Sequence, residues 1–201
     1  MLVTAIVDFD KKRKKIYLDY EYFFFLYNSE LRKYGISEGV ELEDSIFKEL
    51  NDDVIAKRAK KRALYILKST QKTERQLKDK LIENGYSEYH AVLAVEYAKS
   101  FGYVNDENYV RYYIECAQDR KSKKDIECSL VRRGISKDII ETVIEEFDFD
   151  EKEALLTALR KKGLYPEQLD NLEINEKNKI YAFLMRKGFS MESIKKILYS
   201  L

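Results

Sequence analysis

The side chains that most often perform catalysis are scarce in this chain of 201 residues. His90 is the only histidine, and it falls within a stripe of helical spacing, where a structural or solvent-exposed role is expected. Cys116 and Cys128 lack the spacing of a metal site or a redox pair, so both are expected to be reduced thiols. The sequence has no glycine-rich phosphate loop and no nucleophile elbow.

Carboxylates are plentiful in residues 141–153, where a predicted helix ends and a linker begins. No histidine or glycine stands among them to suggest an acid–base pair or a metal site, so we interpret them as solvated charge. We therefore expect a protein that is not an enzyme and that holds no cofactor and no metal ion.

Basic side chains form the more informative pattern, because they concentrate in one segment. Residues 56–104 hold eleven basic and five acidic side chains, a net charge of +6, whereas the whole chain carries +1. Five of the six positions in residues 57–62 are cationic, which exceeds what a helix end requires. A phosphate group or an acidic protein surface is therefore a candidate partner, beside the plain alternative of a solvated helix face.

Other cations have a simpler explanation. Residues 132–133, 160–162 and 186–187 stand at predicted helix ends, where positive charge complements the helix dipole. Tyrosines such as Tyr109 and Tyr113 have helical spacing that favours packing over base stacking. The residues that we expect to contact a partner are Arg58, Lys61, Arg62, Arg75, Lys78, Arg120, Lys123 and Lys124.

The composition as a whole is balanced, with 37 basic and 36 acidic side chains. One proline and seven glycines leave little room for flexible linkers. The first eight residues are too short and lack the basic leader of a secretion signal, and no apolar run reaches membrane-spanning length. We expect a cytoplasmic monomer with no membrane partner.

The first part of the chain carries a strand pattern. Residues 3–9 are apolar and β-branched, and residues 10–14 form a charged turn. Ile16, Leu18 and Tyr20 then occupy alternate positions, as in a strand with one buried face. This pattern predicts a β-hairpin.

The aromatic run in residues 22–26 fits either a third strand or the start of a helix, and we favour the strand. Asp44 is a suitable cap for a short helix that reaches Leu50. A unit of residues 1–55 with two or three strands and one or two helices buries little surface by itself, so we expect it to pack on the helices after residue 55.

A repeat replaces the strand pattern after residue 55. Gly85, Gly134 and Gly188 are 49 and 54 residues apart, and a serine follows two positions after each of them. Glycine at such a position can end a helix in the left-handed conformation. Each glycine is preceded by two apolar residues four positions apart, which lie on one helix face: Leu77 and Leu81, Ile126 and Leu130, and Ile180 and Leu184.

Each repeat therefore reads as a three-helix module, with Thr73 and Gln76 as a candidate capping box at the start of one helix. Short helices cannot hold a large core alone, so neighbouring modules are expected to stack. The predicted fold is mainly α, with tandem three-helix modules stacked into an elongated, curved array and a small β-containing N-terminal unit. The expected modules are residues 56–104, 105–148 and 149–201.

Three stretches of the repeat resemble the RecX family. Residues 69–86 resemble its first-module signature, residues 101–111 its linker into the second module, and residues 121–135 its basic stretch before a helix that ends at glycine. The resemblance covers roughly residues 56–201. Asn105, Gln76 and the pair Ser122 and Lys123 depart from the usual residues, which puts a local cap or turn in doubt but leaves the fold in place.

The resemblance implies a regulatory protein that binds the RecA nucleoprotein filament. RecX proteins mostly inhibit the recombinase, ATPase and SOS co-protease activities of that filament, and so act in homologous recombination and DNA repair. The alternative is a helical DNA-binding module that acts directly on single- or double-stranded DNA, which the +6 segment also permits. Steep salt dependence on naked DNA, without recombinase, would favour that alternative.

Overall fold

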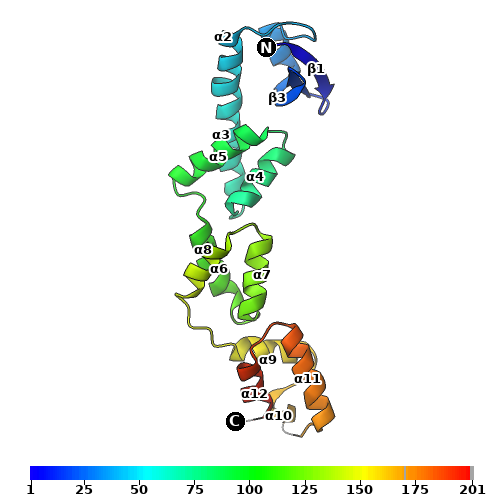
Figure 1. Cartoon of the computed structure of the whole chain (residues 1–201), viewed down its shortest axis with the longest axis vertical. Coiled ribbons are helices and arrows are strands. Elements are labelled where there is room, and N and C mark those ends of the chain that lie inside the picture. The colour runs from blue at the N-terminus through cyan, green and yellow to red at the C-terminus, as the bar shows by residue number, and fades with distance from the viewer. Residues whose placement is uncertain (170, 200–201) are drawn as a thin grey trace. The chain divides into compact units, whose positions relative to one another are not determined.

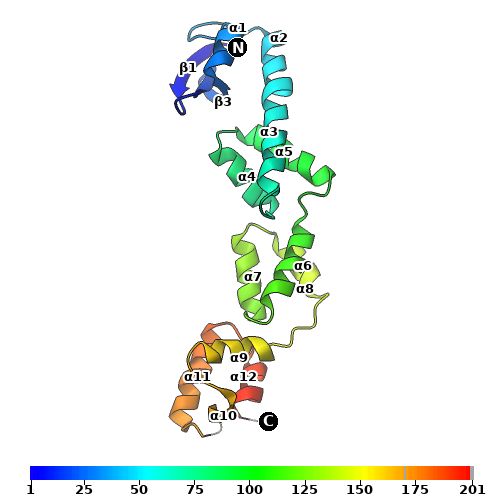
Figure 2. The same cartoon turned by 180° about the vertical axis from the view of Figure 1, so that it is seen from behind.

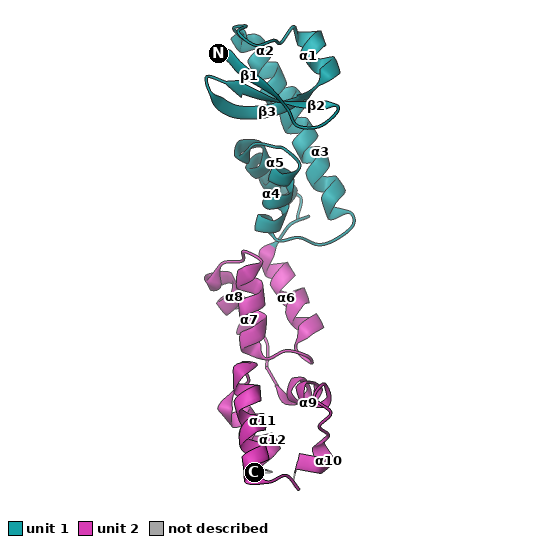
Figure 3. Cartoon of the chain, turned by 90° about the vertical axis from the view of Figure 1, so that its right-hand side faces the viewer, with its two compact units in different colours: residues 1–105 teal, residues 106–201 magenta. Residues whose placement is uncertain are grey.

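The structure is a computed structural model that describes residues 1–169 and 171–199 (Figure 1). The chain divides into two compact units, residues 1–105 and residues 106–201 (Figure 3). Most described residues are helical, and the described strands form one sheet in the first unit. The prediction of a mainly α fold with a small β-containing N-terminal unit is thus confirmed, and stacking into an elongated array stays a prediction.

The sheet contains three antiparallel strands in the order β1-β2-β3, so the predicted hairpin and the favoured third strand are confirmed. Ile6 pairs with Ile16, and Ile16 pairs with Phe24, so these three apolar residues lie side by side across the strands, on the same face of the sheet. The strands are β1 (Val3–Asp8), β2 (Arg13–Leu18) and β3 (Glu21–Tyr27), and α1 (Asn28–Tyr34) follows directly.

Helical backbone then runs without a break from Asp44 to Leu67, through α2 (Asp44–Lys48), the π-helical segment η1 (Glu49–Ile55) and α3 (Ala56–Leu67). The predicted end near Leu50 is wrong, because no glycine or proline interrupts this stretch. The predicted division at residues 55 and 56 therefore falls inside a helix that the sheet and the first module share.

Strand β3 is buried on both faces, which explains why its sequence reads as an unbroken aromatic run. Phe24 packs on Phe47 of α2 with ring centroids 6.4 Å apart. Its neighbour Phe25 points the other way and packs on Tyr86, with centroids 5.2 Å apart. Tyr86 follows Gly85 in the turn between α4 (Glu74–Glu83) and α5 (Glu88–Ser100), so β3 lies between α2 and the first module.

The second unit contains two further sets of helices, each with its own apolar cluster. One cluster joins α6 (Asp106–Ala117), α7 (Lys123–Arg132) and α8 (Lys137–Ile144). The other joins α9 (Lys152–Arg160), α10 (Pro166–Leu169), α11 (Ile174–Arg186) and α12 (Met191–Leu198). Figures 1 and 2 both show α9 close to α12, in agreement with their contacts.

The predicted turns between paired helices are confirmed. Gly85, Gly134 and Gly188 have φ angles of 94°, 87° and 85°, in the left-handed region. The capping box is present as well, because the backbone N–H of Gln76 donates to Thr73 Oγ1 at 3.1 Å and the backbone N–H of Thr73 donates to Gln76 Oε1 at 3.3 Å.

Candidate functional site

Two polar side chains join the helix sets of the second unit. Ser122 caps α7 by accepting from the Asp125 N–H at 3.1 Å, and its hydroxyl donates to the Lys187 carbonyl at the end of α11, at 2.7 Å. Glu151 precedes α9, yet its buried carboxylate accepts from the Lys123 N–H at 3.2 Å and from the Ser190 N–H at 3.0 Å. An anion at the starts of α7 and α12 complements both helix dipoles. These bonds hold the two helix sets together.

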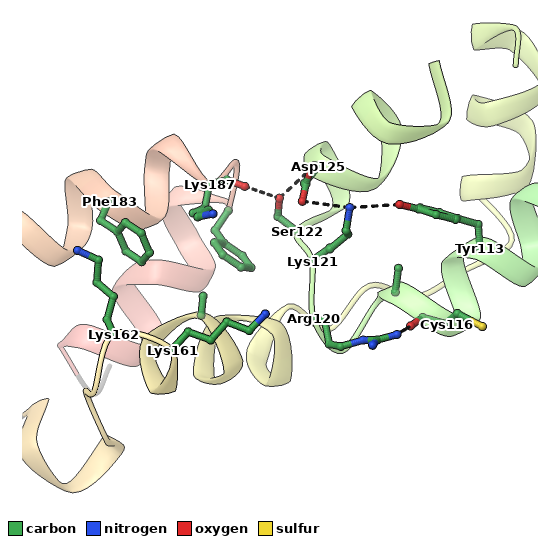
Figure 4. A pocket seen from close by; sticks show the side chains of 13 residues that line it. Tyr113, Cys116, Arg120, Lys121, Ser122, Asp125, Lys161, Lys162, Phe183 and Lys187 are labelled. Atoms are coloured by element: carbon green, nitrogen blue, oxygen red, sulfur yellow. Dashed lines mark hydrogen bonds and ion pairs between the residues drawn. The ribbon is translucent and has the colours of Figure 1, made fainter. Parts of the chain in front are cut away.

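A cleft of about 630 Å³ lies beside this joint and is lined by residues of both helix sets. Figure 4 shows Lys161 extending from the end of α9 toward Arg120, which lies in the turn after α6. One carboxylate, that of Asp125, also lines the cleft. The five cationic side chains of the lining are Arg120, Lys121, Lys161, Lys162 and Lys187, and we call this site the basic cleft.

Aromatic rings and neutral groups hold several of these cations. The Lys162 ammonium lies 4.3 Å from the ring centroid of Phe183, and the Lys187 ammonium lies 6.0 Å from it. The Arg120 guanidinium donates to the backbone carbonyl of Cys116. Within the described part of the chain, the structure records an ion pair for none of these three cations, nor for Lys161. A ring or a carbonyl positions a cation without removing its net charge.

Lys121 is the cation of the cleft that has a carboxylate partner, at 3.5 Å from Asp125. Its ammonium also donates to the hydroxyl oxygens of Tyr113 at 3.2 Å and Ser129 at 3.1 Å. Burial acts to raise the pKa of Tyr113, but the hydrogen bonds to Ser129 and Lys121 and the nearby positive charge outweigh it and lower that pKa below its usual value. The electrostatic potential at this wall of the cleft is therefore positive.

The structure places Arg120, a predicted contact residue, in the basic cleft. Lys123 and Lys124 line a different hollow of about 570 Å³, together with the acidic residues Glu127 and Asp148. The two lysines are exposed, and Lys123 lies 5.7 Å from the ring centroid of Phe149. The three predicted residues of this unit thus belong to two separate hollows.

In the first unit, the Arg58 side chain is mostly engaged in contacts within the protein. It forms an ion pair with Glu30, and the two side chains are only 20% and 19% exposed. Its guanidinium also lies over the rings of Phe25 and Tyr27, at 5.4 Å and 4.9 Å. Sequence reasoning could not detect this, because the partners lie some thirty positions away along the chain.

The other predicted residues of the first unit are more accessible. Lys61 is exposed, and the described residues provide no ion-pair partner for it. Arg62 donates to Asn84 Oδ1 at 2.8 Å, and Arg75 lies 3.8 Å from Asp79. Lys78 pairs with Glu88 at 2.6 Å. Lys61 and Arg62 lie on α3, and Arg75 and Lys78 lie on α4. None of these four residues lines the basic cleft.

Sequence reasoning missed four residues of the basic cleft, namely Lys121, Lys161, Lys162 and Lys187. It assigned the last three to helix ends, and they do stand at the ends of α9 and α11. The signal that could have found them is the recurrence of cations after three helices, α6, α9 and α11, whose C-terminal ends all contribute to one cleft. Helix-dipole complementation explains each lysine alone but not their convergence on one cleft.

The described residues show no group of three or more histidine, cysteine, aspartate or glutamate side chains that could hold a metal ion. His90 is buried, with Nδ1 2.8 Å from Ser87 Oγ and Nε2 3.4 Å from the Asn51 carbonyl. It therefore joins η1 to α5 as a structural side chain. No helix in residues 1–169 or 171–199 combines the length and the apolar character needed to cross a membrane.

Comparisons with known proteins give a consistent result. A family model described as RecX, third three-helix domain, matches residues 150–198. A "Regulatory protein RecX" from Caldanaerobacter subterraneus subsp. tengcongensis is 36% identical over 202 residues, which covers 98% of each chain. Another from Clostridium botulinum is 30% identical over 94% of this chain and 90% of that protein.

Solved structures agree in fold. The "Crystal structure of regulatory protein RecX" matches with a TM-score of 0.65 and 22% identity, and the match covers 100% of this chain and 99% of that one. The crystal structure of RecX from Lactobacillus salivarius matches with a TM-score of 0.62 and 24% identity, covering 73% of this chain and 96% of that chain.

Proposed function

Because the chain belongs to the RecX family, we propose that it binds the RecA nucleoprotein filament and restrains its recombinase, ATPase and SOS co-protease activities. The observation that carries this proposal is the similarity to regulatory RecX proteins over nearly the full length of both chains. The site chemistry supports it, because the basic cleft offers positive charge for binding a partner.

The proposed mechanism is a shift of the equilibrium between filament states. A bound protein changes that equilibrium only by the difference between its affinities for the states. A chain with several helical modules can contact more than one filament subunit, and each contact raises the effective concentration for the next. We expect the protein to act in this way as a monomer in the cytoplasm, where it restrains recombination and the SOS response.

The exposed cations among the predicted residues are the proposed contacts. They are exposed, so a partner can reach them without disturbing the fold: Lys61, Arg75, Arg120, Lys123 and Lys124. Arg58 is also a predicted contact, but a substitution there would disturb the Glu30 ion pair and so confuse binding with folding. Variants that test binding should leave Arg58 intact.

The test is the ATPase activity of RecA on single-stranded DNA, titrated with this protein. We expect inhibition that saturates as the filament becomes covered. The double variant Lys61→Glu and Arg75→Glu should shift the titration to higher protein concentration, because each change places negative charge where we expect an acidic partner surface. The double variant Lys48→Glu and Lys68→Glu reverses two other exposed lysines and is the control for net charge.

Two outcomes would contradict the proposal at different levels. If the wild-type protein leaves the ATPase unchanged and does not co-sediment with the filament, the proposed function is wrong. If both double variants inhibit equally well, the function stands and the contact assignment in the first unit fails.

A further inference from the structure

We propose that the end of helix α5 carries a docking surface for a protein, and that its partner is a subunit of the RecA filament. The inference rests on the proposed function and adds a contact that the predicted basic residues do not include. The surface consists of the rings of Tyr97, Phe101 and Tyr103 and the ammonium group of Lys60 on α3. We call it the aromatic surface.

Helix α5 is apolar on more than its buried face. The face that packs into the core of the first unit carries His90, Ala91, Ala94, Val95 and Ala98. A second row at a spacing of four residues lies toward the surface and ends just past the helix: Tyr89, Leu93, Tyr97 and Phe101. Tyr89 and Phe101 are more than half exposed. A helix that only covers a core carries polar residues there, so this row indicates a further contact.

The turn that ends α5 leaves its closing residue outside. Gly102 has a φ angle of 71°, and the N–H of Tyr103 donates to the Ala98 carbonyl at 3.0 Å, the same bond as in the turns at the three recurrent glycines. The residues that follow those glycines are at most 5% exposed: Tyr86, Ile135 and Phe189. Tyr103 is 61% exposed instead, and its ring stacks on Phe101. The turn therefore presents a ring to a partner where the other turns bury one.

The exposed rings form one contiguous patch. The ring centroids of Tyr97 and Phe101 lie 4.9 Å apart, and those of Phe101 and Tyr103 lie 6.3 Å apart. The Lys60 ammonium lies 5.1 Å from the Tyr97 centroid at the edge of the patch. Single exposed rings are common, but contiguous aromatic patches mark protein interfaces, because stiff rings bury a large apolar area at a low entropy cost.

The charges beside the rings favour a protein over a nucleic acid. Glu74 and Glu96 both pair with Lys99, at 2.9 Å and 3.3 Å, so two carboxylates share one cation close to the rings. They repel a phosphate backbone, which needs several cations. Lys60 forms no ion pair with the described residues. An apolar side chain flanked by a carboxylate on the partner matches both the rings and Lys60.

The test measures binding of the labelled full-length protein to RecA filaments on single-stranded DNA, at low and at high salt. The double variant Phe101→Ala and Tyr103→Ala should bind at least about tenfold more weakly, as expected for central interface rings. This loss should persist at high salt, because salt does not screen apolar contacts, whereas the effect of Lys61→Glu with Arg75→Glu should shrink. Lys60→Glu should cause a smaller, salt-sensitive loss.

The matched control is Tyr20→Ala with Tyr165→Ala, which removes two rings that are 86% and 51% exposed and lie outside the aromatic surface. It should bind the filament as the wild type does. Thermal unfolding of the Phe101 and Tyr103 double variant should give a Tm near that of the wild type, because substitutions of exposed side chains change stability little. A marked decrease in Tm would show that the chain itself covers these rings and would overturn the proposal.

Three further results would contradict the aromatic surface. One is a folded double variant that binds the filament as tightly as the control does. Another is an equal loss of binding to a labelled oligothymidylate without RecA, which would make nucleic acid the ligand of the rings. The third is self-association of the wild type in sedimentation that the double variant abolishes, which would make a second copy the partner.

The same experiment separates this inference from the proposed function. If the wild type binds the filament and the double variant binds equally well, only the aromatic surface is wrong. If the wild type does not bind the filament, the proposed function is wrong, and this inference fails with it.

Discussion

The Ser122 hydroxyl donates a hydrogen bond of 2.7 Å to the Lys187 carbonyl, and this bond links the start of α7 to the end of α11. The same oxygen accepts from the Asp125 N–H, so one buried side chain caps a helix and joins two helix sets. The basic cleft lies beside this bond, and both residues line it. Substitutions at the joint should therefore affect stability and cleft geometry together.

Ser122→Ala should lower the free energy of unfolding of the second unit by about 2 kcal/mol. It removes a helix cap, which contributes about 1 kcal/mol, and a hydrogen bond that satisfies the Lys187 carbonyl, which contributes about 1 kcal/mol more. Ser136→Ala is the matched control, because Ser136 caps α8 at 3.4 Å and is exposed. Urea unfolding of both variants measures the difference, and equal losses would show that the bond to Lys187 contributes nothing.

Gly188→Ala should destabilise the protein more than Gly163→Ala does. Both glycines have positive φ angles, 85° and 75°, so each alanine incurs a similar backbone strain of about 1–2 kcal/mol. A Cβ at Gly188 would also lie 3.0 Å from Lys124 Cβ and 3.0 Å from Ser122 Oγ, whereas one at Gly163 meets nothing within 4 Å. Thermal unfolding of the pair isolates the contact, and an equal shift in Tm would argue against close packing at the joint.

Arg58→Ala should lower the stability of the first unit by about 2–3 kcal/mol, because it removes a charge-assisted hydrogen bond to Glu30 and two ring contacts. The control Lys57→Ala breaks an ion pair with Asp53 whose side chains are 66% and 60% exposed, and should cost less than about 1 kcal/mol. Chemical denaturation compares them. A loss of RecA binding by Arg58→Ala at unchanged stability would contradict this structural role and support Arg58 as a contact residue.

Stability should decrease as the pH falls below about 6.5, the usual pKa of histidine in an unfolded chain. Burial lowers the pKa of His90 in the folded protein, although the Asn51 carbonyl and the Asp52 charge oppose this. The unfolded chain therefore takes up the proton first, and stability is lost from that pH down to the lower folded pKa. His90 is the only histidine, so His90→Gln should abolish this part of the pH profile. An unchanged profile in unfolding experiments between about pH 5.5 and pH 7 would contradict this assignment.

Tyr20→Gly should stabilise the first unit by roughly 0.5–1 kcal/mol. Asp19 and Tyr20 form the two-residue turn between β2 and β3 with φ angles of 47° and 71°, a conformation that strains residues other than glycine or asparagine. The Tyr20 side chain is 86% exposed, so its removal sacrifices little packing. Asp19 should be kept, because its Oδ1 accepts from the Leu2 N–H at 3.0 Å. A lower Tm in the variant would refute the strain argument.

The sequence alone determined the local features of this protein. Helix faces, the capping box at Thr73 and the turns at Gly85, Gly134 and Gly188 depend on residues a few positions apart, so their spacing was sufficient to predict them. The aromatic run of β3 was ambiguous, because a strand buried on both faces loses its alternation and its second covering residue, Tyr86, lies about sixty positions later.

Only the tertiary structure decided which cations act together. Arg58 and Lys61 look alike in the sequence, but Arg58 pairs with Glu30 and lies over the rings of Phe25 and Tyr27, whereas Lys61 is exposed. These partners come from α1 and β3, so helical spacing alone could not separate the two cations. Lys161 and Lys187 read as separate helix ends, and they reach one cleft with Arg120 because Ser122 and Glu151 join the two helix sets there. Charge is a property of each residue, whereas a binding site depends on distances between residues that only the packing of distant segments sets.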